Sequence, residues 1–586
     1  MAKTEIAKFE TPEEKRHFWH SSSHLLAEAV TGIWPDALPT IGPAIDGGFY
    51  YDFDKKEPFT PQDLEKIEKK MREIAERGEK IARKEVSAEE ARKLFAKNPY
   101  KLELINEFAE KGEKITLYYQ GKFFDLCEGG HADSLGQIRA IKLLKVAGAY
   151  WRGSEKNKML QRIYGISFPK KEMLEDYLKM IEEAEKRDHK RIGKEMDLFM
   201  QSELVGKGLP IWLPKGEIIR QEIEELAMRM EKKAGYVRVR TPHLAKKELY
   251  LMSGHLPHYA ETMYPEMKLD DGSYYLKAMN CPHHHLIYNH RQRSYRELPL
   301  RIAEYGTCYR NELSGTLTGL LRVRMLSMND AHIYCTFDQI ESEFESVIKM
   351  IVDYYKVFGF GDYYFRLSLH DPQNREKYID DPKGWSLTEG ILRNVLERLK
   401  VKFVEAKGEA SFYGPKVDIQ FKMVTGREET MSTVQLDFAA KKKFGLSYAD
   451  RDGKENGEVY VIHRAPLSTH ERLIAFLIEH YAGNFPMWLN PVQAIVFAVS
   501  EKFSDYAKKV QDALIEAGIR SEFDDSDNTL PYKVRRAQLE RTNYAVTVGG
   551  REEEAGTVTA RDRKGKLETM KLEEFVSRLA EEARKP

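Results

Sequence analysis

The sequence predicts a protein of several domains in which helices and strands are mixed, an α+β fold class. Three observations support this. At 586 residues the chain is too long for one hydrophobic core, and about 150 residues per domain gives three or four domains. Helical periodicity and strand-like runs rich in aromatic residues and glycine occur together in the same regions. Roughly the last hundred residues alternate strand and helix regularly.

The composition excludes several classes of protein. Hydrophobic residues make up 42% of the chain and charged residues 32%, as in ordinary water-soluble domains. No apolar run approaches the roughly 20 residues of a membrane span, and the N-terminus has no apolar signal core, so we expect a cytoplasmic protein without a membrane partner. Four cysteines are too few and too scattered for a disulfide framework. With 93 basic and 93 acidic residues, nucleic-acid binding must come from local patches.

The first region, to about residue 150, reads as strands interrupted by helices. The runs GPAIDGGFYYDF and KITLYYQGKFFDLC are typical of hairpins, and residues 60–83 and 88–96 are expected to be helical. A heavily charged segment, residues 170–196, has apolar residues near helical spacing. We expect this segment to be one helix that connects two domains.

The region from about residue 198 to 483 combines long helices with strands that end at proline or glycine. Residues 218–233 have helical spacing, and YVRVRTP reads as a strand that stops at Pro242. The final part of the chain has the order β-α-β-α-β, which predicts a small parallel sheet with right-handed crossovers. The predicted divisions are 1–168, a linker helix over 169–196, 197–486 and 487–586.

An arginine-rich stretch between Leu286 and Arg324 contains seven arginines against three glutamates. Within it, the motif C-Y-R-N-E at 308–312 places Arg310 close to Glu312, ahead of a glycine-containing turn and a second basic segment, LLRVRML, read as a strand. The guanidinium fork matches phosphate oxygens with two bonds, so this arrangement suits a phosphate held between two strands. Charge alone is more typical of a solvated surface than of a binding site.

A second candidate is VIHRAPLSTHERLIAFL, residues 461–477. A strand containing His463 leads into a helix that is expected to open near Ser468 and to carry Arg472 in its first turn. The free N–H groups and positive dipole end of a helix N-terminus attract anions, and Arg472 would add a full charge. A surface arginine on an amphipathic helix is the alternative.

A third candidate consists of two histidine- and cysteine-containing pairs in the first region. His20 and His24, like Cys127 and His131, are four residues apart and can share one side of a helix. The residue types alone favour a zinc site.

Taken together, these motifs resemble those of class II aminoacyl-tRNA synthetases. The segments LKAMNCPHHH, LPLRIAEYGTCYRNELSG, LLRVR, NDAHIYC, SFYGPKVD, STVQLDF and VIHRAPLSTHER are similar to the threonyl-tRNA synthetase family, from about His20 to the C-terminus. The resemblance implies an antiparallel-sheet catalytic core at 197–486, an N-terminal α+β editing domain at 1–168 and a C-terminal α/β anticodon-binding domain at 487–586. Such synthetases usually carry a ubiquitin-like domain first; only 19 residues precede His20, so the resemblance implies that it is lacking.

The resemblance also implies roles for individual residues. The chemistry would use ATP with Mg²⁺ and one Zn²⁺ per chain in the catalytic core. The implied catalytic residues are Arg310, Arg472 and His255, and the implied zinc ligands are Cys281, His332 and His463. The implied ATP-binding residues are Arg310, Glu312, Arg322, Gln435 and Arg472, and the implied threonine-binding residues are Met279, Asp330, Tyr413 and Lys416. Without the resemblance, a lone histidine such as His332 is more often structural.

Three protein ligands leave zinc an open position, where the amino and hydroxyl groups of threonine can bind and valine cannot. Serine differs by one methyl group, worth about 1–3 kcal/mol, so hydrolytic editing of seryl-tRNA is expected. The resemblance assigns this to an editing pocket without an obligatory metal, formed by His20, His24, Tyr51, Lys101, Asp125, Cys127 and His131. It assigns contacts with the anticodon of tRNA(Thr) to Arg535, Glu552 and Arg561. It also implies a homodimer whose interface uses the helix over 218–233 and the strand before Pro242.

The sequence departs from the family's pattern at a few positions. Leu326 replaces an aromatic residue that stacks on adenine, Met328 and Thr430 replace glutamines, Ser468 replaces a glycine, and the strand expected after Pro282 begins HHH rather than Gly-His. A lost stack weakens binding by about 1–3 kcal/mol. We therefore expect an active enzyme with altered substrate affinity. The alternatives are a non-catalytic RNA-binding paralogue and a deacylase with a silent synthetic site.

Overall fold

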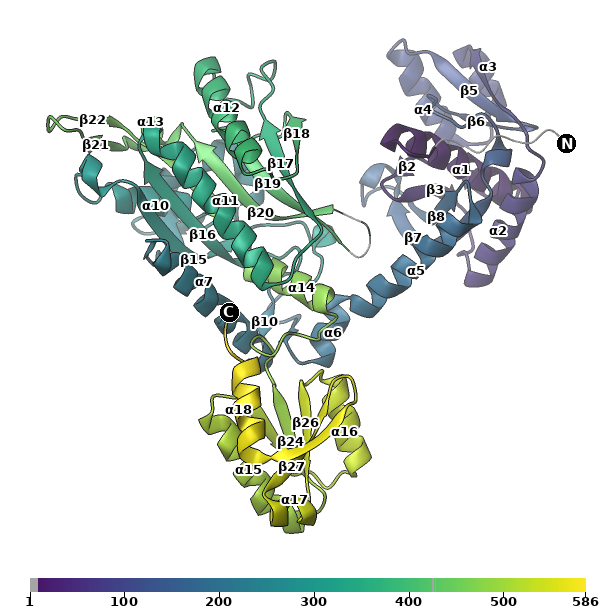
Figure 1. Ribbon diagram of the computed structural model, residues 1–586. Coiled ribbons are helices and arrows are strands. Elements are labelled where there is room, and N and C mark those ends of the chain that lie inside the picture. Colours follow the sequence, from purple (N-terminus) through teal and green to yellow (C-terminus); the bar gives the residue numbers. More distant parts are fainter. Residues whose placement is uncertain (1–8, 424–425, 427) are drawn as a thin grey trace. The chain divides into compact units, whose positions relative to one another are not determined.

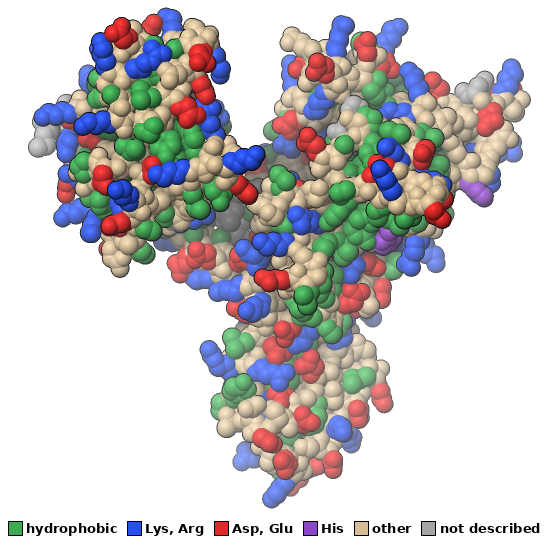
Figure 2. All heavy atoms as spheres, turned by 180° about the vertical axis from the view of Figure 1, so that it is seen from behind, with side chains coloured by type: hydrophobic (Ala, Val, Ile, Leu, Met, Phe, Trp, Pro, Cys, Tyr) green, Lys and Arg blue, Asp and Glu red, His purple; other side chains and the backbone are tan. Residues whose placement is uncertain are grey.

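The computed structural model describes residues 9–423, 426 and 428–586 (Figure 1). The chain divides into two compact units, one up to Ile181 and one from Glu182 onward, each with its own hydrophobic core. In the part of the chain that is described, no helix is both long and apolar enough to cross a bilayer. Basic and acidic side chains are interspersed over the surface drawn in Figure 2, in keeping with the net charge of zero.

The first unit is built on a helix laid against an antiparallel sheet. Helix α1 (Pro12–Ile33) begins at Thr11, whose side chain forms a capping box with Glu14. It buries apolar side chains such as Leu25 against the sheet. The strands of this sheet are β1 (Leu38–Pro39), β2 (Ala44–Ile45), β3 (Gly48–Asp54), β7 (Ala140–Tyr150) and β8 (Met159–Phe168). The hairpin predicted over GPAIDGGFYYDF is confirmed as β2 and β3, and the turn between them contains Gly47 with φ of +82°.

A smaller three-stranded sheet completes the unit. Its strands are β4 (Ile81–Val86), β5 (Ile115–Gln120) and β6 (Phe123–Leu126), and helices α3 (Ala88–Leu94) and α4 (Pro99–Glu110) accompany it. The hairpin predicted in KITLYYQGKFFDLC is confirmed as β5 and β6. The prediction of a helix over 60–83 was wrong in its last third: α2 (Pro61–Ala75) ends before Gly78, whose φ is +65°, and β4 follows.

The segment predicted as one connecting helix is two helices. Helix α5 (Lys171–Arg187) is followed by α6 (His189–Glu195), and Asp188 between them caps α6 by accepting a hydrogen bond from the Lys190 amide at 2.7 Å. Aspartate competes with helical hydrogen bonding and favours caps, which explains the break.

The second unit contains an eight-stranded sheet in the order β11-β15-β16-β23-β20-β19-β17-β18. All neighbours are antiparallel except the two edge pairs. The strands are β11 (Val237–Arg238), β15 (Leu300–Tyr309), β16 (Met325–Cys335), β17 (Tyr363–Leu369), β18 (Phe403–Lys407), β19 (Lys416–Lys422), β20 (Glu428–Asp437) and β23 (Tyr460–Ala465). The strand predicted up to Pro242 is thus only two residues long, and the LLRVRML segment becomes strand only from Met325.

Helices cover one face of this sheet. Helices α7 (Pro214–Lys233), α11 (Ile340–Val357) and α14 (His470–Tyr481) share a core with Ile333, Val434 and Ile462 from the strands. Because successive side chains of a strand point to opposite faces, the neighbours His332, Gln435 and His463 point to the other face. The sheet therefore separates an apolar layer from a polar one.

The C-terminal domain confirms the predicted strand-helix alternation and adds to it. Strands β24 (Ala494–Ala498), β25 (Ser521–Asp524) and β26 (Tyr544–Val548) are parallel, with α15 (Ser504–Glu516) and α16 (Leu530–Leu539) between them. Helix α17 (Gly550–Ala555), β27 (Thr557–Asp562), β28 (Leu567–Lys571) and α18 (Leu572–Glu582) follow. Because β27 and β28 are antiparallel, the sheet is mixed and not purely parallel.

Candidate functional site

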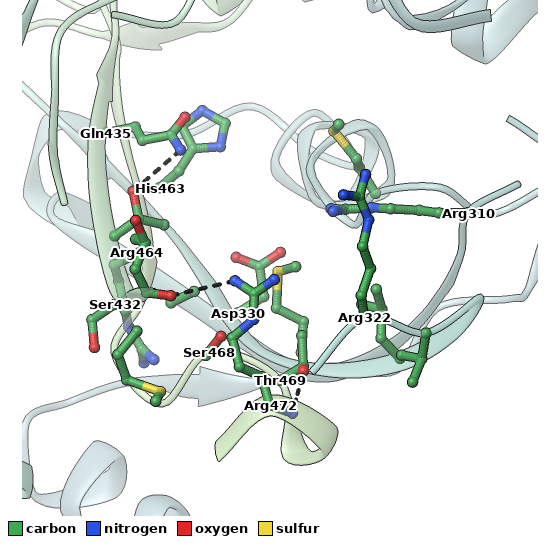
Figure 3. Close-up of a pocket in the computed structure, with 18 of the residues that line it drawn as sticks. Arg310, Arg322, Asp330, Ser432, Gln435, His463, Arg464, Ser468, Thr469 and Arg472 are labelled. Carbon is green, nitrogen blue, oxygen red and sulfur yellow. Dashed lines mark hydrogen bonds between the residues drawn. The ribbon is translucent and has the colours of Figure 1, made fainter. Parts of the chain in front are cut away.

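A cavity of about 710 Å³ opens on the polar face of the eight-stranded sheet (Figure 3). Its walls come from the loop between β15 and β16, from β16, β20 and β23, and from the first turn of α14. Most of the predicted core residues line it: Met279, Cys281, Arg310, Glu312, Arg322, Asp330, His332, Tyr413, Gln435, His463 and Arg472. Segments more than 190 residues apart in sequence thus form one site.

Four of the described arginines line this cavity, of which Arg464 is paired with the buried Glu231 carboxylate. The other three are suited to binding an anion. Arg310 follows the end of β15, Arg322 donates to the Glu312 carboxylate at 2.8 Å, and Arg472 lies in the first turn of α14, where its amide donates to the Thr469 hydroxyl. Figure 3 shows Arg310 and Arg322 on the same side of the cavity in this view and Arg472 extending from the helix. Burial lowers the pKa of Arg472, and the nearby charges of Arg310 and Arg322 lower it further. A polyphosphate would relieve this repulsion.

Cys281, His332 and His463 form a candidate metal centre. Cys281 opens helix α10 (Cys281–Tyr288), and His332 and His463 face each other across the β16–β23 pair. One ligand atom of each residue lies within 4.8 Å of the others. Burial raises the pKa of the Cys281 thiol well above the ordinary value for cysteine. Burial also lowers the pKa of His332 well below the ordinary value for histidine. A divalent cation would supply the positive charge that these buried donors lack.

The sheet register explains how ligands so distant in sequence meet. His332 lies opposite His463, His463 lies opposite Gln435, and Gln435 lies opposite Lys416. These four side chains form one row across the sheet. No local spacing in the sequence encodes such a row, because it depends on the order of the strands.

Two further residues contact the ligands and were not singled out from the sequence. The Asp437 carboxylate accepts a hydrogen bond from His463 Nε2 at 3.1 Å, and His284 Nδ1 lies 2.7 Å from His332 Nδ1. Both stand in segments already noted, STVQLDF and NCPHHH. The HHH run is helical, within α10, and not a strand as predicted.

Two predicted residues lie beside the main cavity. Lys416 pairs with the Asp418 carboxylate at 2.7 Å, within the same sheet. His255 lines a smaller neighbouring cavity with Cys281 and His463, and its Nε2 is 3.8 Å from Cys281 Sγ. Burial lowers the pKa of His255 to about 4, which keeps the imidazole neutral.

The first unit has a second cluster, around a cavity of about 360 Å³. The predicted residues His20, His24, Tyr51, Lys101, Asp125 and Cys127 line it, and His131 lies behind Cys127 with its Nε2 3.1 Å from Sγ. His20 and His24 share one side of α1, as predicted. Cys127 and His131 lie in the loop after β6 and not on a helix, so that prediction was wrong; the loop nevertheless brings both to α1.

This second cluster is balanced by its own charges. Although burial opposes it, hydrogen bonding to Asp125 raises the pKa of His24 to about 9. Burial also opposes ionisation of Cys127, yet hydrogen bonds from His131, His20 and His24 lower the pKa of its thiol to about 3. Lys101 Nζ lies 2.5 Å from the Asp125 carboxylate, so two cations face two anions.

Comparisons with known proteins identify the domains in which these sites lie. Residues 265–481 match the class II tRNA synthetase core domain (G, H, P, S and T), 493–582 match an anticodon binding domain, and 115–164 match the second additional domain of threonyl and alanyl tRNA synthetases. Threonine–tRNA ligase of Anoxybacillus flavithermus is 49% identical, over 98% of this chain and 90% of its own length. Threonine–tRNA ligase 1 of Bacillus subtilis is 49% identical over 97% and 88%.

The chain belongs to the threonine–tRNA ligase family. A solved structure agrees: the RNA binding domain of threonyl-tRNA synthetase from Cryptosporidium parvum covers 68% of this chain and 99% of its own, with 32% identity and a TM-score of 0.64. The predicted class II core, editing domain and anticodon-binding domain are thereby confirmed as the fold of this threonine–tRNA ligase family member.

Four of the positions that depart from the family pattern line the main cavity: Leu326, Met328, Thr430 and Ser468. Leu326 and Met328 pack with Cys308 and Val323 in a small apolar group beside it. Ser468 has φ of +54°, a left-handed conformation that glycine adopts at lower cost. The glycine usual in the family fits this backbone, and Ser468 adopts it nonetheless.

The predicted anticodon residues lie on three elements of the C-terminal domain. Arg535 is exposed on α16, and Arg561 lies on β27 opposite Ala545. Glu552, in α17, accepts hydrogen bonds from the Gly549 amide and the Thr559 hydroxyl. Glu552 therefore also has an internal structural role.

Proposed function

We propose that this chain attaches threonine to tRNA(Thr) through a threonyl-adenylate, with ATP and Mg²⁺ as substrate. One observation carries the proposal: three arginines suited to a polyphosphate and a Cys/His/His centre suited to zinc line the same cavity. Membership of the threonine–tRNA ligase family, over nearly the whole chain, agrees with it.

The arginines would bind and orient ATP. Arg310 would hold the α-phosphate and Arg472 the terminal phosphates, while Arg322, freed from Glu312, would contribute a further charge. The threonine carboxylate then attacks the α-phosphorus, and pyrophosphate leaves with its charge neutralised by these guanidinium groups and Mg²⁺. In the second step a ribose hydroxyl of the tRNA attacks the adenylate carbonyl, and AMP leaves. His255, being neutral, can accept the proton of that hydroxyl.

Cys281, His332 and His463 would hold one zinc ion with a position open to the substrate. The donor set fits zinc, since one ligand atom from each of two imidazoles and one cysteine sulfur lie within 4.8 Å of one another. Bound there, zinc would supply a Lewis acid for the amino and hydroxyl groups of threonine, and valine, which has no hydroxyl, would leave that coordination incomplete. Asp330, buried beside the centre, would accept a hydrogen bond from threonine. Tyr413, hydrogen-bonded to Gln435, would complete the pocket wall.

The first unit would hydrolyse seryl-tRNA without a metal. The His24 imidazolium and the Lys101 ammonium lie against the cavity and can stabilise the negative charge that develops on the carbonyl oxygen of the ester as water adds to its carbonyl carbon. The bond between that carbon and the ribose oxygen then breaks, the ribose oxygen takes a proton, and serine and tRNA leave. The positive charges of His24 and Lys101 neutralise the negative charges of Cys127 and Asp125. The cluster therefore requires no metal cation for charge balance. The C-terminal domain would bind the anticodon through Arg535, Glu552 and Arg561.

A homodimer is part of the proposal. The short strand β11 stands at the edge of the large sheet, and Val237 in it is 50% exposed. An open edge with an apolar side chain is suited to pairing with a second copy, together with α7. Light scattering after size exclusion should give twice the chain mass.

The proposal is tested by threonine-dependent exchange of pyrophosphate into ATP, with valine and serine as comparison substrates. We expect exchange with threonine, weaker exchange with serine and none above background with valine. Absence of exchange at saturating ATP and threonine would contradict the proposed synthetic activity and would favour the alternatives of a paralogue or a deacylase.

A further inference from the structure

The ligand His332 has a second ring nitrogen, and a buried chain of polar groups continues from it. His332 Nδ1 lies 2.7 Å from His284 Nδ1, and His284 Nε2 lies 3.2 Å from the Glu304 carboxylate. All three residues are buried, with exposed fractions of 1%, 0% and 4%. The chain thus runs from the proposed metal centre to a carboxylate on β15.

Glu304 can only accept hydrogen bonds. Its carboxylate accepts from the Thr241 amide at 2.8 Å and from the Thr241 hydroxyl at 2.9 Å, and Lys277 Nζ lies 3.6 Å away. Burial opposes its charge, but His284, Thr241 and Lys277 lower its pKa to about 2. An ionised carboxylate has no proton to give, so His284 Nε2 must be the donor in that contact.

The remaining tautomers follow from this one. A neutral His284 whose proton is on Nε2 has a bare Nδ1, which can only accept. His332 Nδ1 must then carry a proton and donate it, and His332 Nε2 is left with a free lone pair. We propose that His284 is a positioning residue for the metal centre. Because it donates a hydrogen bond to Glu304, it can only accept one from His332 Nδ1, and this leaves His332 Nε2 as the metal ligand.

The other histidine ligand is fixed more directly. The Asp437 carboxylate accepts hydrogen bonds from the amides of Ala439 and Ala440 at 2.7 and 2.8 Å, and another from His463 Nε2. His463 would therefore bind the metal through Nδ1. Metal-ligating histidines usually donate their other N–H to a carboxylate or carbonyl. Here His463 donates directly to a carboxylate, whereas His332 is linked to one through an intervening histidine.

One helical turn supplies both the ligand and the positioning residue. Cys281 and His284 are three residues apart in α10 and so lie on the same side of it. The adjacent His283 is also buried, but its ring nitrogens have no hydrogen-bond partner among the residues that the structure describes. His283 is therefore a matched control: same helix, same residue type, no link to a ligand.

The inference rests on the proposed zinc site, and zinc affinity tests it without reference to catalysis. We expect His284→Leu to weaken zinc binding by about 10–100-fold, as the loss of such outer partners usually does. His284→Asn keeps an acceptor near the Nδ1 position and should stay within about threefold of the unmodified chain, as should His283→Leu. Affinity is measured by competition with a chromophoric chelator on the full chain.

A second variant keeps the test decisive if His284→Leu does not fold. In Glu304→Gln the new amide can donate to His284 Nε2, which lets the chain of hydrogen bonds reverse and places a proton on His332 Nε2. We expect weakened zinc binding and a changed visible spectrum of the Co²⁺-loaded chain, although no ligand is altered.

The outcomes separate the two proposals. If the unmodified chain binds no zinc, both the zinc site and this inference are overturned. If it binds zinc and His284→Leu or Glu304→Gln binds equally tightly with an unchanged cobalt spectrum, only the role of His284 is overturned. If His284→Asn loses as much affinity as His284→Leu, the hydrogen-bond acceptor is not the cause and the inference is again wrong.

Discussion

The two units each gather cysteine and histidine side chains around a cavity, but their electrostatics are opposite. In the core centre burial raises the pKa of the Cys281 thiol well above its usual range. In the first unit hydrogen bonds from three histidines lower the pKa of the Cys127 thiol to about 3. The same donor types thus form a centre without positive charge in the second unit. In the first unit they form a network whose positive and negative charges neutralise each other.

The difference follows from what surrounds each cysteine. Cys127 stands beside His24, which Asp125 keeps protonated, so a thiolate has a cation at hand. Cys281 stands among the acidic Asp330 and Asp437 and beside His332, whose pKa burial lowers. Both clusters contain the donor types of a metal site, but the neighbouring charges favour a metal only in the core.

Replacing each cysteine should separate the two activities, and this is the largest effect we expect. Cys281→Ser should reduce threonine-dependent exchange by more than about 100-fold, since a ligand matters more than its outer partners. Cys127→Ser should leave exchange within about twofold and instead impair hydrolysis of seryl-tRNA. If Cys127→Ser also abolishes exchange, the two clusters are not independent.

An aromatic residue restored at position 326 should change ATP binding in the core and leave the first unit unaffected. Leu326→Phe offers adenine a stacking surface, worth about 1–3 kcal/mol. We expect the KM for ATP to fall about tenfold, with kcat little changed and seryl-tRNA hydrolysis unaffected. An unchanged or higher KM would show that Leu326 does not face the nucleotide.

The stabilisation that His24 gives the first unit should disappear at high pH. The pKa of His24 is raised from 6.5 to about 9, so its charged form stabilises the fold fully below pH 6.5 and the contribution is lost as pH rises through 9. The lowered pKa of Cys127, about 3, acts in the opposite direction, because its thiolate adds stability as pH rises toward the unfolded value of about 8.5. We therefore expect the difference in stability between the unmodified chain and His24→Gln to shrink by about 1–3 kcal/mol between pH 7 and 10. Hydrogen exchange of the α1 amides in both chains measures this difference, and a difference that does not change with pH would contradict the assigned charge on His24.

The smallest effect that we expect is in the alkylation of Cys127, whose rate should hardly change with pH. With a pKa of about 3, the Cys127 thiol is already ionised at pH 5, so its rate with iodoacetamide should vary by less than about twofold from pH 6 to 8. An ordinary thiol speeds up about tenfold per pH unit over that range. Peptide mapping follows each cysteine separately; a tenfold rise at Cys127 would contradict the assigned network.

The sequence predicts these sites unevenly, for physical reasons. The hairpins at 42–53 and 114–127 and the helix carrying Arg472 follow from local patterns, because turn residues and caps act over a few positions. The helix over 60–83 and the single linker helix failed at Gly78 and Asp188, where one residue ends a periodic pattern. His284 and Glu304 emerge only from the fold, since strand order and burial decide which hydrogen bonds exist.

Zinc content of three purified chains tests the central contrast most directly. Metal analysis should find about one zinc per unmodified chain, about one in Cys127→Ser and none retained in Cys281→Ser, because only the core centre needs a cation. Two zinc ions in the unmodified chain, with one lost in Cys127→Ser, would contradict the account and make the first-unit cluster a metal site.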